Sequence, residues 1–400
     1  MNNRKSSIKI KKDSIKIDHS YDKNNSFLKF NKKQESNDQK KIKLLIQKAL
    51  VDKNIISRID QKHIHIIQAL KEDLLDNKKT NKKINFNISP SVEKEIELLE
   101  YEDLLRFLIH RYRYEIYPQT LERDDYPPYL QIEPTSFCNF RCVFCFQSNP
   151  SFSGKKNGFM GHMTFETFRE IVDQAENKIE FISLASRGEP LICHDIEKML
   201  AYTRNKFLNL KINTNASVLT ESKIHSILQS GVKTLVFSAD AADEKLYEKL
   251  RVNGNFKKTI KNISLFKEIR EKHYPKKKII TRVSGVKVNE SQNFEDMKNL
   301  WDELVDQVAF VDYCPWEDVY SSKKNEFQKP CTELWRRMYV WWDGVANPCE
   351  VDFKSLLTVG KIHKNDIRSL WTSSAYENLR EKHRRNLRLD INPCNKCVVI

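Results

Sequence analysis

Short apolar runs alternate with longer amphipathic segments along the chain from Pro128 onward. Six runs rich in β-branched and aromatic residues predict strands: YLQIEP, IEFISLAS, LKINTN, TLVFSAD, IITRVSGV and VAFVDY. Helical periodicity predicts helices between them: MTFETFREIVDQAEN, HDIEKMLAYTRNK, LTESKIHSILQSG, DEKLYEKLR with FKKTIKNISLFKEIREK, and NFEDMKNLWDELVD. This alternation indicates parallel βα units in an α/β fold, either a partial barrel or a doubly wound sheet. Both folds place their sites at the carboxyl ends of the strands.

The pattern before residue 128 is helical rather than alternating. Over residues 41–75 apolar positions recur at helical spacing, which predicts one or two amphipathic helices. A long apolar stripe predicts a further helix over about residues 91–114. We therefore expect residues 41–127 to form a helical extension. Residues 1–40 are rich in Lys, Asn and Ser with three aromatic residues, which predicts a disordered, low-complexity basic tail.

Length and composition allow a folded enzyme with a second, smaller domain. The chain has 400 residues, of which 40% are hydrophobic, enough for a sizeable core. No apolar run approaches the roughly 18 residues that a membrane span needs, and the lysine-rich start lacks the apolar segment of a secretion signal. We therefore expect a cytoplasmic protein with no membrane partner. In that compartment its nine cysteines are better explained as metal ligands than as disulfides.

The formal net charge of +15 is concentrated at the N-terminus. Residues 1–90 contain 22 Lys and Arg against 10 Asp and Glu, whereas the rest of the chain contains 47 against 44. Such a charge run is usually a solvated surface; a non-catalytic metal protein that binds nucleic acid through it is the alternative. Basic residues with few aromatic neighbours make a poor platform for stacking bases, which disfavours nucleic acid as a partner.

Three cysteines lie within the eight residues CNFRCVFC, directly after the first predicted strand. Cys138, Cys142 and Cys145 are too few for a closed structural zinc site, which needs four ligands, unless His162 serves as the fourth. Three thiolates on a four-iron cluster would instead leave one iron with an open coordination position. Zinc remains an alternative, and the number of thiols favours an iron-sulfur cluster.

The spacing C-x3-C-x2-C, with Phe144 before the last cysteine, resembles the signature of the radical S-adenosylmethionine (SAM) superfamily. The resemblance implies a partial (β/α)6 TIM-like barrel over residues 128–315 and a [4Fe-4S] cluster whose open iron binds SAM. It also implies an electron donor such as flavodoxin or ferredoxin, because reductive cleavage of SAM gives the 5'-deoxyadenosyl radical that abstracts hydrogen from a substrate. The protein would supply binding, orientation and shielding.

Further motifs similar to that family follow the later predicted strands in order. SRGEP, NTNAS and FSADAADEKLYEKLR resemble its glycine–glutamate, TNG and SxDG segments. Arg187 and Ala216 depart from the pattern, since each stands where the family commonly has glycine. The residues that the resemblance assigns to SAM binding are Phe144, Gly188, Glu189, Pro190, Asn215, Ser238 and Arg251. Turn capping or a surface ion pair is the alternative role for Asn215, Ser238 and Arg251.

Four more cysteines lie in a second region, residues 329–400. The pattern C-x12-G-x4-C begins at Cys331 and ends at Cys349, and its glycine suits a hairpin turn. Cys394 and Cys397 form a later C-x2-C. This arrangement resembles the SPASM/twitch extension of radical SAM enzymes and implies one auxiliary [4Fe-4S] cluster on four thiolates. A zinc ribbon would use the same four thiolates, and prenylation of Cys397 in the terminal Cys-Val-Val-Ile is a third alternative.

Two cysteines remain after both sets are assigned. Cys193 is expected to be a buried apolar side chain. Cys314 follows the sixth predicted strand, at the mouth of the barrel, and is either a catalytic hydrogen-atom donor or an inert thiol.

The resemblance implies an oxidoreductase-type enzyme that abstracts hydrogen from a small polar substrate, such as a sugar or an aminocyclitol, or from a peptide. An auxiliary cluster favours a two-electron oxidation, whereas quenching of the substrate radical by Cys314 would make the protein an epimerase. A peptide-modifying maturase is a further alternative. We find no β-rich segment before residue 128 of the kind that grips a leader peptide in such enzymes, which favours a substrate without a leader.

Overall fold

The sheet at the centre of the protein is continuous. The computed structural model describes residues 21, 27–32, 36–75, 84–317 and 319–400, and within these its strands form one ten-stranded sheet, in the order β1-β7-β6-β5-β4-β3-β2-β8-β9-β10. The six predicted strands are present and parallel: β2 (Tyr129–Ile132), β3 (Phe181–Leu184), β4 (Asn209–Thr214), β5 (Val232–Ser238), β6 (Ile280–Lys287) and β7 (Gln307–Asp312). A doubly wound sheet reverses its strand order at a switch point. The unbroken order from β2 to β7 therefore excludes that alternative and favours the partial barrel.

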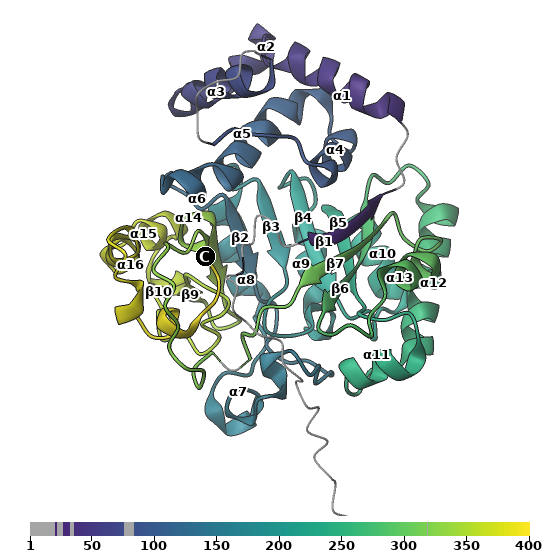
Figure 1. Cartoon of the computed structure of the whole chain (residues 1–400). Helices are drawn as coiled ribbons and strands as arrows, with labels where there is room; N and C mark the ends of the chain where they lie inside the picture. The colour runs from purple at the N-terminus through teal and green to yellow at the C-terminus, as the bar shows by residue number, and fades with distance from the viewer. Residues whose placement is uncertain (1–20, 22–26, 33–35, 76–83, 318) are drawn as a thin grey trace, which may run out of the picture.

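Helices between these strands cover the outer face of the sheet (Figure 1). They are α8 (Phe165–Ala175), α9 (Ile196–Tyr202), α10 (Glu221–Gln229), α11 (Glu244–Leu250), α12 (Phe256–His273) and α13 (Phe294–Trp301). Leu210 and Ile212 of β4 are fully buried in the core beneath these helices, together with Trp301. Side chains alternate across a strand, so Lys211, between the two apolar residues, lies on the inner face.

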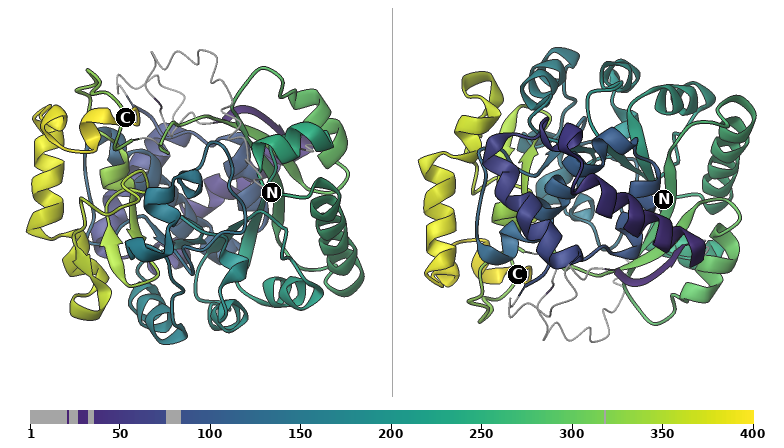
Figure 2. Two further views of the ribbon diagram at one scale, coloured as in Figure 1. Left: turned by 90° about the horizontal axis from the view of Figure 1, so that it is seen from below. Right: turned by 90° about the horizontal axis from the view of Figure 1, so that it is seen from above.

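A layer of helices covers the amino-terminal ends of the barrel strands (Figures 1 and 2). It consists of α1 (Ser36–Ala49), α2 (Lys53–Ile56), α3 (Ile64–Leu74), α4 (Pro90–Glu97), α5 (Leu104–Glu115) and α6 (Tyr117–Thr120). Their apolar side chains form one cluster with Tyr129, Phe181 and Leu208, which stand at or just before the starts of β2, β3 and β4. This helical cap therefore separates that end of the barrel from solvent.

The single helix expected over residues 91–114 is wrong, because the chain forms two helices there. Helix α4 ends at Glu97, and a 3-10 turn at Tyr101–Asp103 leads into α5. The turn contains no proline or glycine that would have signalled a break. A tertiary contact helps to fix it instead, since the Tyr101 hydroxyl donates to Asp52 at 3.1 Å.

A strand occupies part of the segment for which the sequence predicts a disordered tail. Strand β1 (Phe27–Lys32) pairs antiparallel with β7, and α1 begins at Ser36. For these residues the expectation of disorder is wrong, because the free edge of β7 offers backbone hydrogen-bond partners that composition does not reveal. The most basic part of the predicted tail, residues 1–20, lies outside the described residues.

The C-terminal region extends the same sheet on its other side. Strand β8 (Arg337–Val340) pairs in parallel with β2, and a turn at Gly344 returns the chain as β9 (Val345–Asn347). Gly344 has a φ of 78°, which confirms the predicted hairpin turn. The remaining elements are α7 (Pro150–Ser153), α14 (Glu333–Arg336), β10 (Gly360–Lys361), α15 (Ile367–Trp371) and α16 (Ser374–Arg384). Among the described residues, no helix has the length and apolar character needed to cross a membrane.

Candidate active site

The three cysteines of CNFRCVFC lie on the loop that leaves the carboxyl end of β2. Cys142 raises the pKa of Cys138, and both raise that of Cys145, so the three thiols lie within electrostatic reach of one another. They pack in one apolar cluster with Phe140, Phe144, Leu250 and Tyr313. The Arg141 N–H donates to the Val252 carbonyl at 2.9 Å, which ties the loop to the segment after α11. The structure therefore brings the three predicted ligands together.

Burial is the main influence on these thiols. It raises the pKa of Cys138 to about 12, and it also raises the pKa values of Cys142 and Cys145. Two donors favour the thiolates: the Phe140 N–H, 3.4 Å from Cys138 Sγ, and the Arg251 guanidinium, whose Nη1 lies 3.8 Å from Cys142 Sγ. Several buried thiols with N–H donors aimed at sulfur are a donor set that fits an iron-sulfur cluster.

Gly188, four residues after the end of β3, packs directly against the cysteine loop. A Cβ atom at this position would lie 2.2 Å from the Thr135 carbonyl oxygen and 2.5 Å from that of Phe137. The next residue, Glu189, donates its backbone N–H to the same Phe137 carbonyl at 2.9 Å. The glycine is thus required by a close approach of two backbone segments.

Replacing Gly188 by alanine should displace the cysteine loop and lower iron incorporation. The new methyl group would meet backbone atoms, which cannot move aside as the end of a flexible side chain can. We expect the G188A protein to keep its secondary structure by circular dichroism but to bind at most about half of the wild-type iron after anaerobic reconstitution. Wild-type iron content in G188A would contradict this account of the loop.

The Glu189 carboxylate joins the ends of β3 and β4. Its oxygens accept hydrogen bonds from the Thr214 hydroxyl at 2.6 Å, the Asn215 N–H at 2.7 Å and the Leu191 N–H at 3.2 Å. Burial raises the pKa of Glu189, and these donors oppose that shift. Pro190 begins the short 3-10 helix that follows, Pro190–Ile192. The GEP and TNA motifs, distant in sequence, therefore form one buried polar network.

Asn215 carries out the turn capping that the sequence offered as its alternative role. Its side-chain oxygen accepts from the Ser217 N–H at 2.9 Å and from the Ser217 hydroxyl at 2.6 Å. Its side-chain nitrogen donates to Asn139 at 3.0 Å and lies 4.0 Å from Cys138 Sγ, so the residue also supports the cysteine loop. Ala216 beside it has a φ of 59°, which explains why glycine is the usual residue there.

Arg251 lies beside Cys142 in a buried ion pair. Its Nε is 2.6 Å from Oδ2 of Asp240, and its guanidinium stands 5.7 Å from the centre of the Phe144 ring. Asp240 also accepts the Val286 N–H at 2.8 Å. Both members of the pair are buried, so the alternative of a surface ion pair is wrong. Ser238, the last residue of β5 and two positions before Asp240, is half-buried.

The second set of cysteines gathers around the end of the C-terminal hairpin. Cys397 raises the pKa values of Cys331 and Cys394, in each case adding to a larger effect of burial. Arg388 is fully buried and donates to the carbonyl oxygens of Cys394 at 3.2 Å and Cys397 at 2.5 Å, which fixes the C-x2-C turn. Cys349 follows the hairpin and lies within electrostatic reach of the Tyr376 hydroxyl, as Cys331 does.

Two family models match the chain at these two sets of cysteines. The model described as the radical SAM superfamily matches residues 132–296, and SPASM, described as an iron-sulfur cluster-binding domain, matches residues 331–398. The chain belongs to the radical SAM superfamily. Its radical SAM domain implies a [4Fe-4S] cluster and SAM, and its SPASM domain implies auxiliary iron-sulfur clusters.

Curated relatives match only part of the radical SAM protein. A GTP 3',8-cyclase of Clostridium botulinum (strain Okra / Type B1) is 28% identical over 214 residues, which is 50% of this chain and 63% of that protein. An AdoMet-dependent heme synthase of Methanosarcina barkeri (strain Fusaro / DSM 804) is 23% identical over 230 residues, 57% of this chain and 61% of that protein. The chain thus spans less than two thirds of the length of either relative.

Solved structures align with this radical SAM protein at low sequence identity. SuiB of Streptococcus suis, bound to S-adenosylmethionine, aligns with a TM-score of 0.50 and 16% identity over 89% of this chain and 87% of that chain. BtrN in complex with AdoMet and 2-DOIA aligns with a TM-score of 0.46 and 18% identity over 67% and 92%. At this sequence identity the likeness to SuiB concerns the fold alone.

Arg187, which departs from the usual radical SAM motif, joins the two matched domains. Its guanidinium donates to both carboxylate oxygens of Glu133, at 2.8 and 2.5 Å, and to the Phe353 carbonyl oxygen at 3.0 Å. The guanidinium also stands 4.2 Å from the ring centre of Trp341 in the SPASM domain. Sequence reasoning missed Glu133; the one available signal was that an arginine at a strand end near the core needs a buried acid as partner.

An apolar cluster lies between the two sets of thiols. Its buried and partly buried members include one cysteine of the radical SAM loop and three of the SPASM domain: Cys145, Cys331, Cys349 and Cys397. Cys314, two residues after β7, packs against the same cluster. The stacked rings of Phe146 and Phe353, 4.7 Å apart, connect the two domains within it. We call this group the interdomain cluster.

The described residues contain no group of three His, Cys, Asp or Glu side chains arranged to hold a single metal ion. A four-iron cluster has a different requirement, because its thiolates bind separate irons. Cys193 lies away from both sets, buried in the outer core with its thiol 3.8 Å from the Met163 carbonyl oxygen. The His162 ring makes tilted contacts with the rings of Phe137 and His194, at centroid distances of 4.9 and 4.3 Å.

Proposed function

We propose that this protein is a radical SAM enzyme that abstracts hydrogen from its substrate and completes a two-electron oxidation with an auxiliary cluster in the SPASM domain. The interdomain cluster carries the proposal, because it packs thiols of both sets into one continuous unit. When bound, SAM and the clusters would supply hydrogen abstraction and an acceptor for the second electron. The substrate is a small polar molecule or a peptide, and a flavodoxin- or ferredoxin-type protein would donate electrons.

The roles of the protein residues follow from where they lie. Cys138, Cys142 and Cys145 would hold the first cluster, and the auxiliary cluster would be held by Cys331, Cys349, Cys394 and Cys397. The SAM-binding set would comprise Phe144, Gly188, Glu189, Pro190, Asn215, Ser238 and Arg251. Within this set Asp240 orients Arg251, and Glu189 fixes the end of β4 rather than offering a free carboxylate. The radical SAM domain would span residues 128–315 and the SPASM domain residues 329–400.

Replacing Cys397 by alanine should remove the auxiliary cluster and leave the first one intact. We expect about eight irons per wild-type chain and about four per C397A chain, with reductant-dependent SAM cleavage within about threefold of wild type. Iron analysis, zinc analysis and electron paramagnetic resonance of the reduced protein measure these outcomes. About four irons and one zinc in the wild type would instead identify a zinc site in the SPASM domain and reject the proposed two-electron oxidation.

The matched control for C397A is Cys314→Ala, which removes a thiol from the same interdomain cluster. Its iron content should equal that of the wild type, because Cys314 belongs to neither set of ligands. The same variant tests epimerisation, the second candidate function, which the packing of Cys314 between the two domains favours. If C314A binds substrate and cleaves SAM but no longer forms a product of unchanged oxidation state, the protein is an epimerase.

A further inference from the structure

The inner face of the barrel is polar at mid-height, in contrast to its outer face. Alternation along the strands places Leu130 and Ile132 of β2, and Leu210 and Ile212 of β4, in the outer core. The residues between them therefore face inward. The strand register aligns Gln131 with Ser183 and Ser183 with Lys211, and it aligns Arg282 with Gln307. Two cationic side chains, from β4 and β6, thus reach the interior of the barrel.

Lys211 has no paired anion within the part of the chain that the structure describes. Among the described residues it has neither a hydrogen-bond acceptor nor an ion-pair partner, although it is half-buried in the middle of a strand. Four charged groups lie within electrostatic reach: Arg282 and Arg337, and the carboxylates of Glu95 and Glu350. Burial, followed by the two arginines, lowers the pKa of Lys211 to about 7, and the two carboxylates oppose that shift. A half-buried ammonium of this kind is suited to an anionic partner.

A second unsatisfied donor lies beside Arg282. The Arg282 Nε donates to the Gln307 side-chain oxygen at 2.8 Å, which sets the orientation of the Gln307 amide. The amide nitrogen of Gln307, which is 0% exposed, is then left buried with no acceptor among the residues that the structure describes. The interior therefore presents an ammonium, a guanidinium and an amide N–H, although one Glu95 oxygen and the Asn213 side-chain oxygen are also buried without a donor among the described residues. The two cationic groups fit a ligand rich in negatively charged oxygen.

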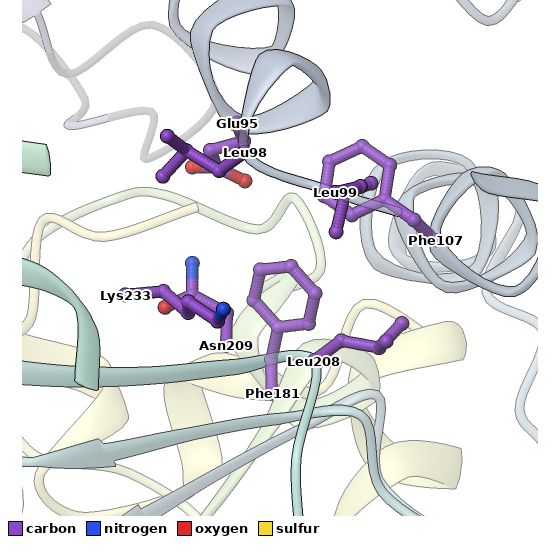
Figure 3. Close-up of a pocket in the computed structure, with 8 residues that line it drawn as sticks. All are labelled: Glu95, Leu98, Leu99, Phe107, Phe181, Leu208, Asn209 and Lys233. Carbon is purple, nitrogen blue, oxygen red and sulfur yellow. The ribbon is translucent and has the colours of Figure 1, made fainter. Parts of the chain in front are cut away.

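The helical cap packs closely over the starts of β3 and β4. One gap between them is a cavity of about 10 Å³, room for about one water molecule. Figure 3 shows Leu99 and Phe107 of the cap lying opposite Phe181 and Leu208 of the strands across this space. The thiol loop lies at the opposite ends of the barrel strands, where the proposed reaction takes place, and we expect a ligand to reach Lys211 from that side.

We propose that Lys211 and Arg282 bind an anionic oxygen group of the substrate, a carboxylate or a phosphate, inside the barrel. The inference rests on the proposed function in that it places this group in the same chamber as the hydrogen abstraction. It excludes uncharged sugars and aminocyclitols as substrates. It favours a peptide with an acidic side chain or a free C-terminal carboxylate, or a phosphorylated small molecule. Glu95 and Glu350 are the competing partners, and neither forms an ion pair with Lys211.

Competitive acylation of lysines on the full-length protein tests the site. The protein is treated with sulfo-N-hydroxysuccinimidyl acetate, and modification of each lysine is followed by mass spectrometry. Increasing succinate or inorganic phosphate should slow the modification of Lys211 about threefold when the ligand is at roughly twice its dissociation constant. Sodium chloride at equal ionic strength controls for screening, and Lys198, whose side chain is 72% exposed, serves as the unprotected reference.

The anion that protects Lys211 identifies the group that the site binds. Protection by succinate alone assigns a carboxylate, and protection by phosphate alone assigns a phosphate. Protection should weaken as the pH rises through about 7, because Lys211 then loses its charge. The variant Arg282→Gln should lose the protection while Lys211 is still modified. No protection by either anion at any concentration up to saturation overturns the inference.

The same preparation separates this inference from the proposed function. SAM cleavage by the reconstituted wild-type protein depends on the cysteine loop and not on an anion in the barrel. Cleavage without protection of Lys211 therefore refutes the anion site alone, whereas protection without cleavage refutes the enzymatic proposal alone.

Discussion

Replacing Cys142 by alanine should abolish the reductive cleavage of SAM, with 5'-deoxyadenosine at least about 100-fold below the wild-type amount. Cys142 is the central thiol of the loop, and the Arg251 guanidinium lies 3.8 Å from its sulfur. Its loss would leave two thiols at a site that needs three, and it would leave Arg251 without the sulfur beside it. Chromatography of the products after anaerobic incubation with dithionite and SAM measures the effect.

The matched control for C142A is Cys193→Ala, since Cys193 is also a buried free thiol of the radical SAM domain. It lies in the outer core rather than on the loop, so C193A should retain both iron and SAM cleavage despite some loss of stability. Reductant-dependent cleavage that persists in C142A would reject the assignment of the loop.

Replacing Arg187 by methionine should lower the free energy of unfolding by about 3–5 kcal/mol. The substitution would leave Glu133, which is 0% exposed, as a buried carboxylate without its cationic partner. It would also remove the hydrogen bond from Arg187 to the Phe353 carbonyl, which joins the radical SAM domain to the SPASM domain. Urea denaturation of the full chain, followed by circular dichroism, measures the change.

The double variant Glu133→Gln with Arg187→Met distinguishes the buried charge from lost packing. A neutral glutamine at position 133 needs no cation, so the double variant should be more stable than R187M alone. If the two variants unfold at the same urea concentration, the loss comes from the packing of Arg187 against Trp341 and not from the ion pair.

The sequence was sufficient for those parts of the fold whose signals are local. Each barrel strand and the helix after it are identified by their own residues, and both sets of cysteines are close enough in sequence to be found by spacing. The break between α4 and α5 was missed because it depends on Tyr101 reaching Asp52, 49 residues away. A helical apolar stripe carries no information about such a contact.

The contacts of the site residues could not be predicted from local sequence patterns either. The motifs located Glu189, Asn215 and Arg251, but not what their side chains contact. Glu133 and Arg187 are 54 residues apart and meet only because β2 and β3 are adjacent and parallel. The role of Arg187 therefore had to wait for the strand order, although the departure of this residue from its motif was visible at once.

The pairing of β1 with β7 sets an order of events during synthesis. Phe27 and its partner Val311 are 284 positions apart, so at 5–20 residues per second the ribosome needs about 14–57 s to make the second after the first. During that time an extended segment with two exposed apolar residues, Phe27 and Leu28, has no native edge to bind. Until β7 emerges, this segment is open to chaperones and to pairing with the wrong edge of another nascent chain.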